Sequence, residues 1–319
     1  MPDSITTIDC EHMFPGHVGA FLLVEGERAA FVDNGAADSV PLLLAALAAR
    51  GLRPEQVEYA MVTHAHLDHA GGTSTLLAAC PTATVLAHPK AARHLISPAR
   101  LIAGAKMVYG EAMYAKLYGD FPPCPAERVR TVADGEVVAW GGRALRFFHT
   151  LGHATHHLCI HDSRSNGVFT GDAFGIIHPE LQDGERPYVF PVAAPPEFDP
   201  PEAKRAIQAI LDTGAERFYA SHFGRFDGLA RRAEQLLCCL DRCEALIQEA
   251  CSSAITDAAL HGLVAERVRA MTIEEVTRCG FDFEAVSRHL EPDILLNTSG
   301  ILVAATRRRK RRSESAEAS

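Results

Sequence analysis

Four side chains that can bind a metal ion lie within six consecutive positions: His64, His66, Asp68 and His69. Three imidazoles and a carboxylate are costly to gather on one short turn unless a cation organises them. Neutral imidazole nitrogens and carboxylate oxygens are ligands that divalent metals such as zinc prefer. The stretch therefore predicts a metalloenzyme rather than a loop that is rich in histidine by chance.

Three further candidate ligands lie downstream and share one pattern, in which a small residue separates an apolar run from the candidate. Taken singly, each is better explained as a surface or hydrogen-bonded residue. Their common position at the ends of predicted strands, where functional loops gather on a rigid scaffold, favours a shared site. They are His153 after 144–149, Asp172 after 167–170 and His222 after 217–220.

Apolar runs and helical periodicities predict the elements that must position these side chains. Strands and helices alternate up to about residue 226, which indicates the α/β class, with a mixed two-sheet sandwich and outer helices. The segment 100–125 breaks this rhythm and predicts a helical insertion or lid. Strands are expected at 18–24, 29–32, 58–63, 84–87, 128–132, 136–139, 144–149, 157–161, 167–170 and 217–220. Helices are expected at 38–50, 74–79, 89–96 and 200–212.

Beyond residue 226 the pattern changes to helices alone, beginning with an apolar stripe from Leu229 to Ile247. Pro292 is expected to separate the last two helices. The basic run Arg307–Arg312 and the polar residues after it predict a disordered tail. We therefore expect three parts: a sandwich domain at 1–226, a helical C-terminal region at 227–306 and a disordered basic tail at 307–319.

The composition limits the partners and the compartment. The chain has 319 residues, 47% of them hydrophobic, which suffices for one large domain and an appendage. Its net charge of −9 argues against nucleic acid as the main partner, because phosphate contacts dominate that binding. Nine scattered cysteines without a Cys-x-x-Cys pair indicate reduced thiols and a cytoplasmic protein. Neither a signal peptide nor a membrane span is expected.

Taken together and in order, these motifs resemble those of the metallo-β-lactamase-fold hydrolase superfamily. The motif residues are Asp33, His64-x-His66-x-Asp68-His69, His153, Asp172 and His222. The resemblance implies an αββα sandwich with a C-terminal helical extension and a dinuclear metal site at one sheet edge. The implied ligands are His64, His66 and His153 for one ion, Asp68, His69 and His222 for the other, and Asp172 as a bridge.

Three other positions have two interpretations each. Asp33 matches a strand-end aspartate that usually supports the ligands in this family, but a turn-forming role before Asn-Gly explains it equally well. His157 matches a second histidine common in the family, and a core histidine is the alternative. His178 follows Asp172 on a loop and could face the site, although a structural role is favoured.

The chemistry implied is hydrolysis. Two cations roughly 3.5–4 Å apart can hold a bridging hydroxide that attacks a carbonyl or phosphoryl centre. Asp68 could also orient the nucleophile or relay a proton, and Asp172 would hold both ions. We therefore expect an enzyme that cleaves a small ester, thioester or lactone with two divalent ions, most simply zinc, with iron or manganese as other options.

Several residues of this sequence differ from the motifs of other branches of the superfamily, and these differences limit the branches that it resembles. His66 stands where flavodiiron-like proteins carry Glu, and true β-lactamases lack the bridging carboxylate of Asp172. The residues 154–171 contain no Tyr, unlike the known acyl-homoserine lactonases. The chain is most similar to the glyoxalase II-like branch, in an uncharacterised subgroup.

Other functions stay open. A mononuclear iron oxidoreductase similar to persulfide dioxygenases would need His64, His153 and Asp172, which are all present. A phosphoester hydrolase or a lactonase would use the same two-metal chemistry, whereas a non-catalytic binding protein is disfavoured because no ligand is missing. The expected partner is a small-molecule substrate, with neither nucleic acid nor membrane, and the C-terminal helices could support a homodimer.

Aromatic residues are expected to line the substrate pocket, from the 100–125 insertion and from the segment 178–196. Packing within the insertion's own small core explains them equally well. The residues are Tyr109, Tyr114, Tyr118, Phe174, Tyr188 and Phe190.

Overall fold

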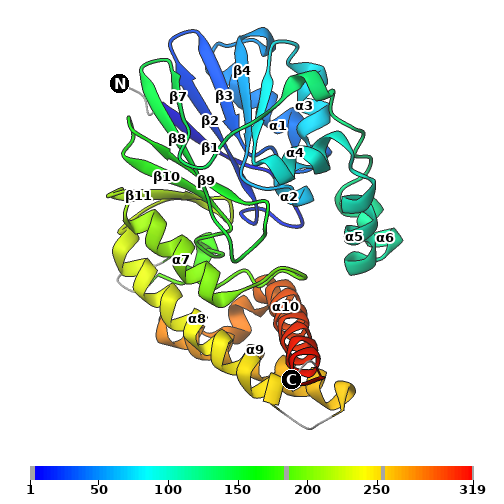
Figure 1. Ribbon diagram of the computed structural model, residues 1–319. Coiled ribbons are helices and arrows are strands. Elements are labelled where there is room, and N and C mark those ends of the chain that lie inside the picture. Colours follow the sequence, from blue (N-terminus) through cyan, green and yellow to red (C-terminus); the bar gives the residue numbers. More distant parts are fainter. Residues whose placement is uncertain (1–3, 183–186, 253–255, 318–319) are drawn as a thin grey trace. The chain divides into compact units, whose positions relative to one another are not determined.

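The computed structural model describes residues 4–182, 187–252 and 256–317. These form two compact units. The first comprises the chain up to residue 149 together with 156–171 and 213–227, and it contains both β-sheets. The second comprises 150–155, 172–212 and the chain from 228 onward. The predicted α/β fold, with two sheets and a C-terminal helical region, is confirmed (Figure 1).

Each sheet has six strands. The first sheet runs in chain order, antiparallel from β1 to β3 and parallel from β3 to β6: β1 Ile5–Asp9, β2 Gly19–Glu25, β3 Arg28–Val32, β4 Val57–Val62, β5 Thr84–Ala87 and β6 Val129–Thr131. In the second sheet, β10 and β11 are the parallel pair: β7 Val137–Trp140, β8 Arg143–His149, β9 Leu158–Asp162, β10 Gly167–Gly171, β11 Arg217–Ala220 and β12 Gly224–Asp227.

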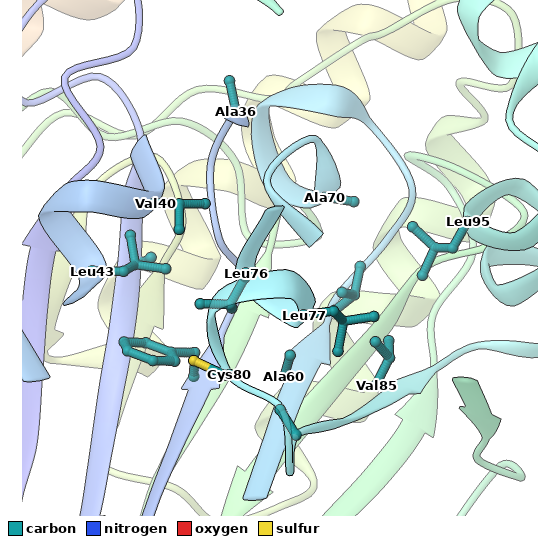
Figure 2. Packing of buried hydrophobic residues seen from close by; sticks show 14 of the residues in the cluster. Ala36, Val40, Leu43, Ala60, Ala70, Leu76, Leu77, Cys80, Val85 and Leu95 are labelled. Carbon is teal, nitrogen blue, oxygen red and sulfur yellow. The ribbon is translucent and has the colours of Figure 1, made fainter. Parts of the chain in front are cut away.

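The first sheet is buried on both faces, because alternate side chains of a strand point to opposite sides. In β2, Ala20 and Leu22 join the core beneath the helices, whereas Phe21 and Leu23 pack with residues of the second sheet. Figure 2 shows the helical side of this core. Its helices are α1 Val40–Ala49, α2 Leu67–Ala70, α3 Thr73–Ala79 and α4 Pro89–Ile96. Near-continuous apolar strands, rather than alternating ones, are the expected sequence of such a sheet.

The remaining helices follow the predictions in part. The insertion is helical, as predicted, and its role as a lid stays a prediction. Single 3-10 turns occur at Ala37–Ser39, Pro54–Gln56, Ala126–Arg128 and Pro179–Leu181. The longer helices are α5 Ala99–Tyr109, α6 Glu111–Leu117, α7 Pro200–Leu211, α8 Leu229–Ser252, α9 Asp257–Arg278 and α10 Phe283–Glu317. Among the described residues, no helix combines the length and apolar character that a membrane crossing requires.

The predicted helix break at Pro292 is wrong, because α10 continues through it. Contacts on the next turns hold this region against the segments 176–182 and 187–194 of the same unit. Asp293 pairs with buried His178 at 2.7 Å, and the Asn297 side chain accepts a hydrogen bond from the Ala193 amide at 2.6 Å. These tertiary contacts offset the backbone hydrogen bond that proline removes.

The prediction of a disordered tail is also wrong for residues 307–317, which extend α10. Residues 318–319 of that predicted tail lie outside the described residues. The arginines at its start are held within the second unit. Arg307 donates to the carbonyls of Pro196 and Phe198, and Arg308 forms a two-pronged pair with Glu244 at 2.6 and 2.8 Å. Bidentate pairing of this kind orders a basic segment that would otherwise stay solvated.

A buried ionic network joins the two sheets. The Arg143 guanidinium on β8 donates to Glu25 at the end of β2 and to Asp162 at the end of β9, both at 2.5 Å. Its side chain is 0% exposed, and it also donates to Ser4. Both carboxylates are buried and need compensation for their lost hydration. Glu25 also accepts a hydrogen bond from the Arg164 side chain at 2.6 Å, whereas Asp162 otherwise accepts from two backbone amides.

We expect Arg143→Ala to lower the free energy of unfolding by about 3–5 kcal/mol, because it leaves the buried Asp162 carboxylate without its cationic partner and Glu25 with Arg164 alone. Arg146→Ala, at an exposed residue three positions along the same strand, is the matched control. The midpoint and slope of urea denaturation measure both variants. Equal losses in the two variants would contradict the structural role of the network.

Candidate metal centre

The histidine cluster sits where β4 gives way to α2. His66 has an extended backbone just before α2, and the rings of His64 and His66 lie close, with centroids 4.5 Å apart. Asp68 and His69 follow on the first turn of α2. Gly72 ends the cluster, and a Cβ there would stand 2.6 Å from the Asn34 carbonyl oxygen. Close approach of two backbones therefore explains this glycine.

Both sheets of the first unit supply one group of candidate ligands. Asp68, His69 and His222 each offer a ligand atom, and these atoms lie within 4.8 Å of one another. His222 comes from the loop after β11. The Asp68 Oδ2 atom is 3.3 Å from His69 Nε2 and 3.5 Å from His222 Nε2. The two ring nitrogens and the carboxylate thus converge on one point, as a metal site requires.

The opposite ring nitrogens show that these histidines are oriented to ligate. His69 Nδ1 lies 3.1 Å from the Asp33 carboxylate, and His222 Nδ1 lies 2.8 Å from the His17 carbonyl oxygen. Both partners accept hydrogen bonds, so each Nδ1 carries a proton, and each Nε2 is directed at Asp68, where it can either donate a hydrogen bond or bind a metal ion. A histidine that ligates a metal is normally fixed in this way. The donor set therefore fits a divalent ion.

Asp33 is the acceptor at the centre of this support. Its buried carboxylate receives hydrogen bonds from the Thr63 amide at 2.9 Å, from the Thr63 hydroxyl and from the Ser221 hydroxyl at 2.8 Å, beside His69. The backbone of Asp33 has φ +54°, which few residues other than glycine adopt. These contacts favour the supporting role over the turn-forming one.

The sequence did not identify Thr63, Ser221 and His17 as parts of the site. Thr63 and Ser221 each directly precede a candidate ligand, so a hydroxyl beside each histidine was the available signal. Thr63 also reaches His64, with 3.1 Å between its Oγ1 and the His64 Nδ1. His17 contributes through its backbone carbonyl, for which the sequence carries no signal.

In the second unit, His153 and Asp172 lie together. His153 Nε2 is 3.3 Å from Asp172 Oδ2, and His153 Nδ1 is 3.1 Å from the Val192 carbonyl oxygen. This repeats the arrangement of the first unit: a carbonyl orients the ring, and Nε2 faces a carboxylate. Both residues line a small cavity of ≈ 10 Å³, whose other walls are mostly apolar and include Leu236 and Leu240 of α8.

Of three further histidines, two pack against the histidine cluster and one has a structural role elsewhere. His157 is fully buried with its ring 5.0 Å from that of His64, and His156 Nδ1 accepts a hydrogen bond from the Ala65 amide at 3.2 Å. Both therefore pack behind the cluster. His178 pairs with Asp293 within the second unit, in agreement with its favoured structural role.

The electrostatics of the site favour an ionised Asp68. Burial alone would raise the pKa of this carboxyl. The attraction and hydrogen bonds of His69 and His222 outweigh burial and hold the pKa of Asp68 well below its usual value. Asp68 is consequently a carboxylate at neutral pH, which is the form that binds a cation.

Comparison with known proteins agrees with this geometry. The sequence matches the model of the family described as the metallo-β-lactamase superfamily over residues 13–222. Among curated relatives, the lactamase-like protein aptB of Emericella nidulans is 28% identical over 120 residues, which cover 38% of this chain and 28% of aptB. The atrochrysone carboxyl ACP thioesterase of Aspergillus fumigatus is 26% identical over 153 residues, 48% of this chain and 38% of the relative. These matches span less than half of the relatives' own length.

A solved structure shows the same fold over nearly the whole chain. The archaeal metallo-β-lactamase superfamily protein from Sulfolobus tokodaii superposes with a TM-score of 0.63 and 19% identity, and it covers 93% of this chain and 98% of its own. The glyoxalase II-like branch stays a prediction. The family match spans more than half of the 319 residues, so the chain belongs to the metallo-β-lactamase superfamily.

Proposed function

We propose that this protein is a metal-dependent hydrolase that uses two divalent ions, most simply zinc, to cleave a small ester, thioester or lactone. The observation that carries the proposal is the shared orientation of its histidines. In His69, His153 and His222, an acceptor holds Nδ1 while Nε2 faces a carboxylate. Fixing three rings in this orientation costs side-chain conformational freedom. Metal ligation explains that arrangement, because ligating histidines are normally held in this way.

We assign His64, His66 and His153 to one ion, Asp68, His69 and His222 to the other, and Asp172 to both. Chain connectivity supports a common site. The loop 150–155 that carries His153 joins β8 to the start of the β9 segment, and Asp172 directly follows β10. Each of these ligands is therefore tethered within a few residues of a strand end of the second sheet.

Two divalent ions bound there would polarise the substrate carbonyl and make water a nucleophile near neutral pH. The residues of the chain do the rest. Asp68, ionised at neutral pH and 19% exposed at its side chain, can accept a hydrogen bond from the attacking water and orient it. Asp33 and Thr63 keep the ligand rings in place and touch no substrate.

Thioesters are the favoured members of this substrate class. The names of two curated relatives, from Aspergillus fumigatus and Emericella nidulans, describe thioesterases. A thioester also needs no proton donor for its leaving group, because the group can depart as a thiolate. Esters and lactones react through the same attack on a carbonyl, but their alkoxide is a poorer leaving group than a thiolate.

We expect Asp33→Asn to weaken metal binding about 10- to 100-fold while the protein stays folded, because an amide cannot accept all the hydrogen bonds that this carboxylate accepts. Asp38→Asn, on an exposed aspartate five residues away, is the control. Competition with a chromophoric chelator measures both affinities. Equal affinities in the two variants would show that Asp33 only shapes a turn.

Replacing His66 or Asp172 with Ala should remove most bound metal and most turnover, with the circular dichroism spectrum unchanged. His261→Ala, on an exposed histidine, should keep both. Elemental analysis and a panel of thioesters, esters and lactones test the same preparations. Wild-type turnover in either ligand variant would rule out the mechanism, and one iron per chain with oxygen uptake would favour the persulfide dioxygenase-like alternative.

A further inference from the structure

Exposed apolar side chains gather on two segments of the first unit. These segments are the β1–β2 loop, residues 10–18, and the α5–α6 arm, residues 99–117. No residue of α5 is buried. Figure 1 shows α5 and α6 side by side, away from the two sheets. The exposed side chains and their exposed fractions are Met13 46%, Met107 88%, Val108 52%, Tyr109 38% and Met113 45%. Exposed apolar patches of this kind usually mark a binding surface.

The β1–β2 loop is held in a costly conformation. Glu11 and Met13 have φ of +51° and +62°, in the left-handed region that residues other than glycine seldom adopt. The Asp9 carboxylate maintains this shape, since it accepts hydrogen bonds from the amides of Glu11 at 2.9 Å and Gly16 at 2.8 Å. Backbone strain that persists under such constraint concentrates at ligand-binding sites.

A continuous series of rings connects the exposed arm with a candidate metal ligand. We call it the ring ladder, and its members are Tyr109, Tyr118, His12, His17 and His222. Successive ring centroids lie 5.7, 5.3, 6.2 and 5.1 Å apart. These separations fall in the range that offset-stacked and edge-to-face aromatic pairs prefer. One end is exposed at Tyr109, and the other lies beside Asp68.

We infer that the β1–β2 loop and the α5–α6 arm together bind a planar aromatic acyl group of the substrate, with its carbonyl directed toward His222 and Asp68. The inference rests on the proposed function. Tyr109, 38% exposed at the outer end of the ladder, offers a ring surface on which another ring can stack. The methionines add polarizable sulfur, which contacts aromatic rings favourably and adapts to their shape.

Continuity with the candidate metal centre decides between this occupant and a second copy of the chain. A surface for self-association has no need to reach a metal ligand. An acyl-binding surface must do so, because the scissile carbonyl has to lie beside the ions while the rest of the acyl group finds contacts elsewhere. The buried rings of His12, His17 and Tyr118 make that connection.

Binding of 2-naphthoate to the full-length, metal-loaded protein tests the inference without requiring turnover. Octanoate and acetate serve as the flexible and the minimal carboxylate. The arm variant Met107→Ser/Tyr109→Ser/Met113→Ser changes side chains that are exposed, so folding should survive. The control variant Val137→Ser/Leu295→Ser removes equally exposed apolar side chains elsewhere, at 55% and 67% exposure.

We expect the wild type to bind 2-naphthoate more tightly than octanoate. The arm variant should bind 2-naphthoate about tenfold more weakly than the wild type, and the control variant should bind it as tightly as the wild type. With thioester substrates, the arm variant should lower the ratio of kcat/KM for naphthoyl over acetyl by a similar factor, through KM. Calorimetry and steady-state kinetics on the same samples give both values.

The other outcomes separate the two proposals. Equal affinity for 2-naphthoate and octanoate, together with thioester hydrolysis, would overturn the inference and leave the proposed function standing. Arm-dependent naphthoate binding without hydrolysis of any substrate would support the binding surface and overturn the proposed function. If the arm variant instead changes the mass found by light scattering and keeps its naphthoate affinity, the patch is a self-association surface and the inference is wrong.

Discussion

The Asp33 carboxylate is the contact on which the site in the first unit depends. It follows β3 of the first sheet, and it receives hydrogen bonds from Thr63 after β4, from His69 on α2 and from Ser221 after β11 of the second sheet. One buried carboxylate thus joins the ends of both sheets and orients a candidate metal ligand. Its own desolvation is compensated only while all these donors are in place, which makes the geometry of the site cooperative.

A second buried ionic contact lies at the other end of β3. Glu25, immediately before the turn into β3, pairs with Arg143 of the second sheet. The sheets are therefore joined by polar contacts at both ends of this strand and by apolar packing between, through residues such as Phe21 and Phe169 at 5.3 Å. Apolar packing is non-directional, whereas charged hydrogen bonds specify register. The ligand spacing across the sheets follows from that register.

His222 connects binding with chemistry. Its Nε2 faces Asp68, its Nδ1 is held by the His17 carbonyl, and its ring continues the ladder from the exposed arm. The strained loop that supplies this carbonyl also carries His12 and Met13. A substrate that stacks on the loop would therefore contact the same segment that orients a metal ligand. Substrate choice and metal geometry would then be coupled through one loop backbone.

The sequence by itself determined what is local. The spacing of His64, His66, Asp68 and His69 after an apolar run predicted both the turn and its chemistry, because ligand type and strand periodicity are encoded within a few residues. The buried strands were found for the same reason. The edge strands β1 and β12 were missed, because polar residues interrupt their apolar pattern.

Only the tertiary structure decided the rest, because the partners are distant in sequence. Pro292 stays inside a helix since Asp293 and Asn297 find partners more than 100 residues away. The basic segment is helical since Glu244 pairs with Arg308. Asp33 supports the ligands instead of merely forming a turn, because Ser221, 188 residues on, reaches its carboxylate. Local patterns carry no information about such contacts, since their free energy arises only when the chain has folded.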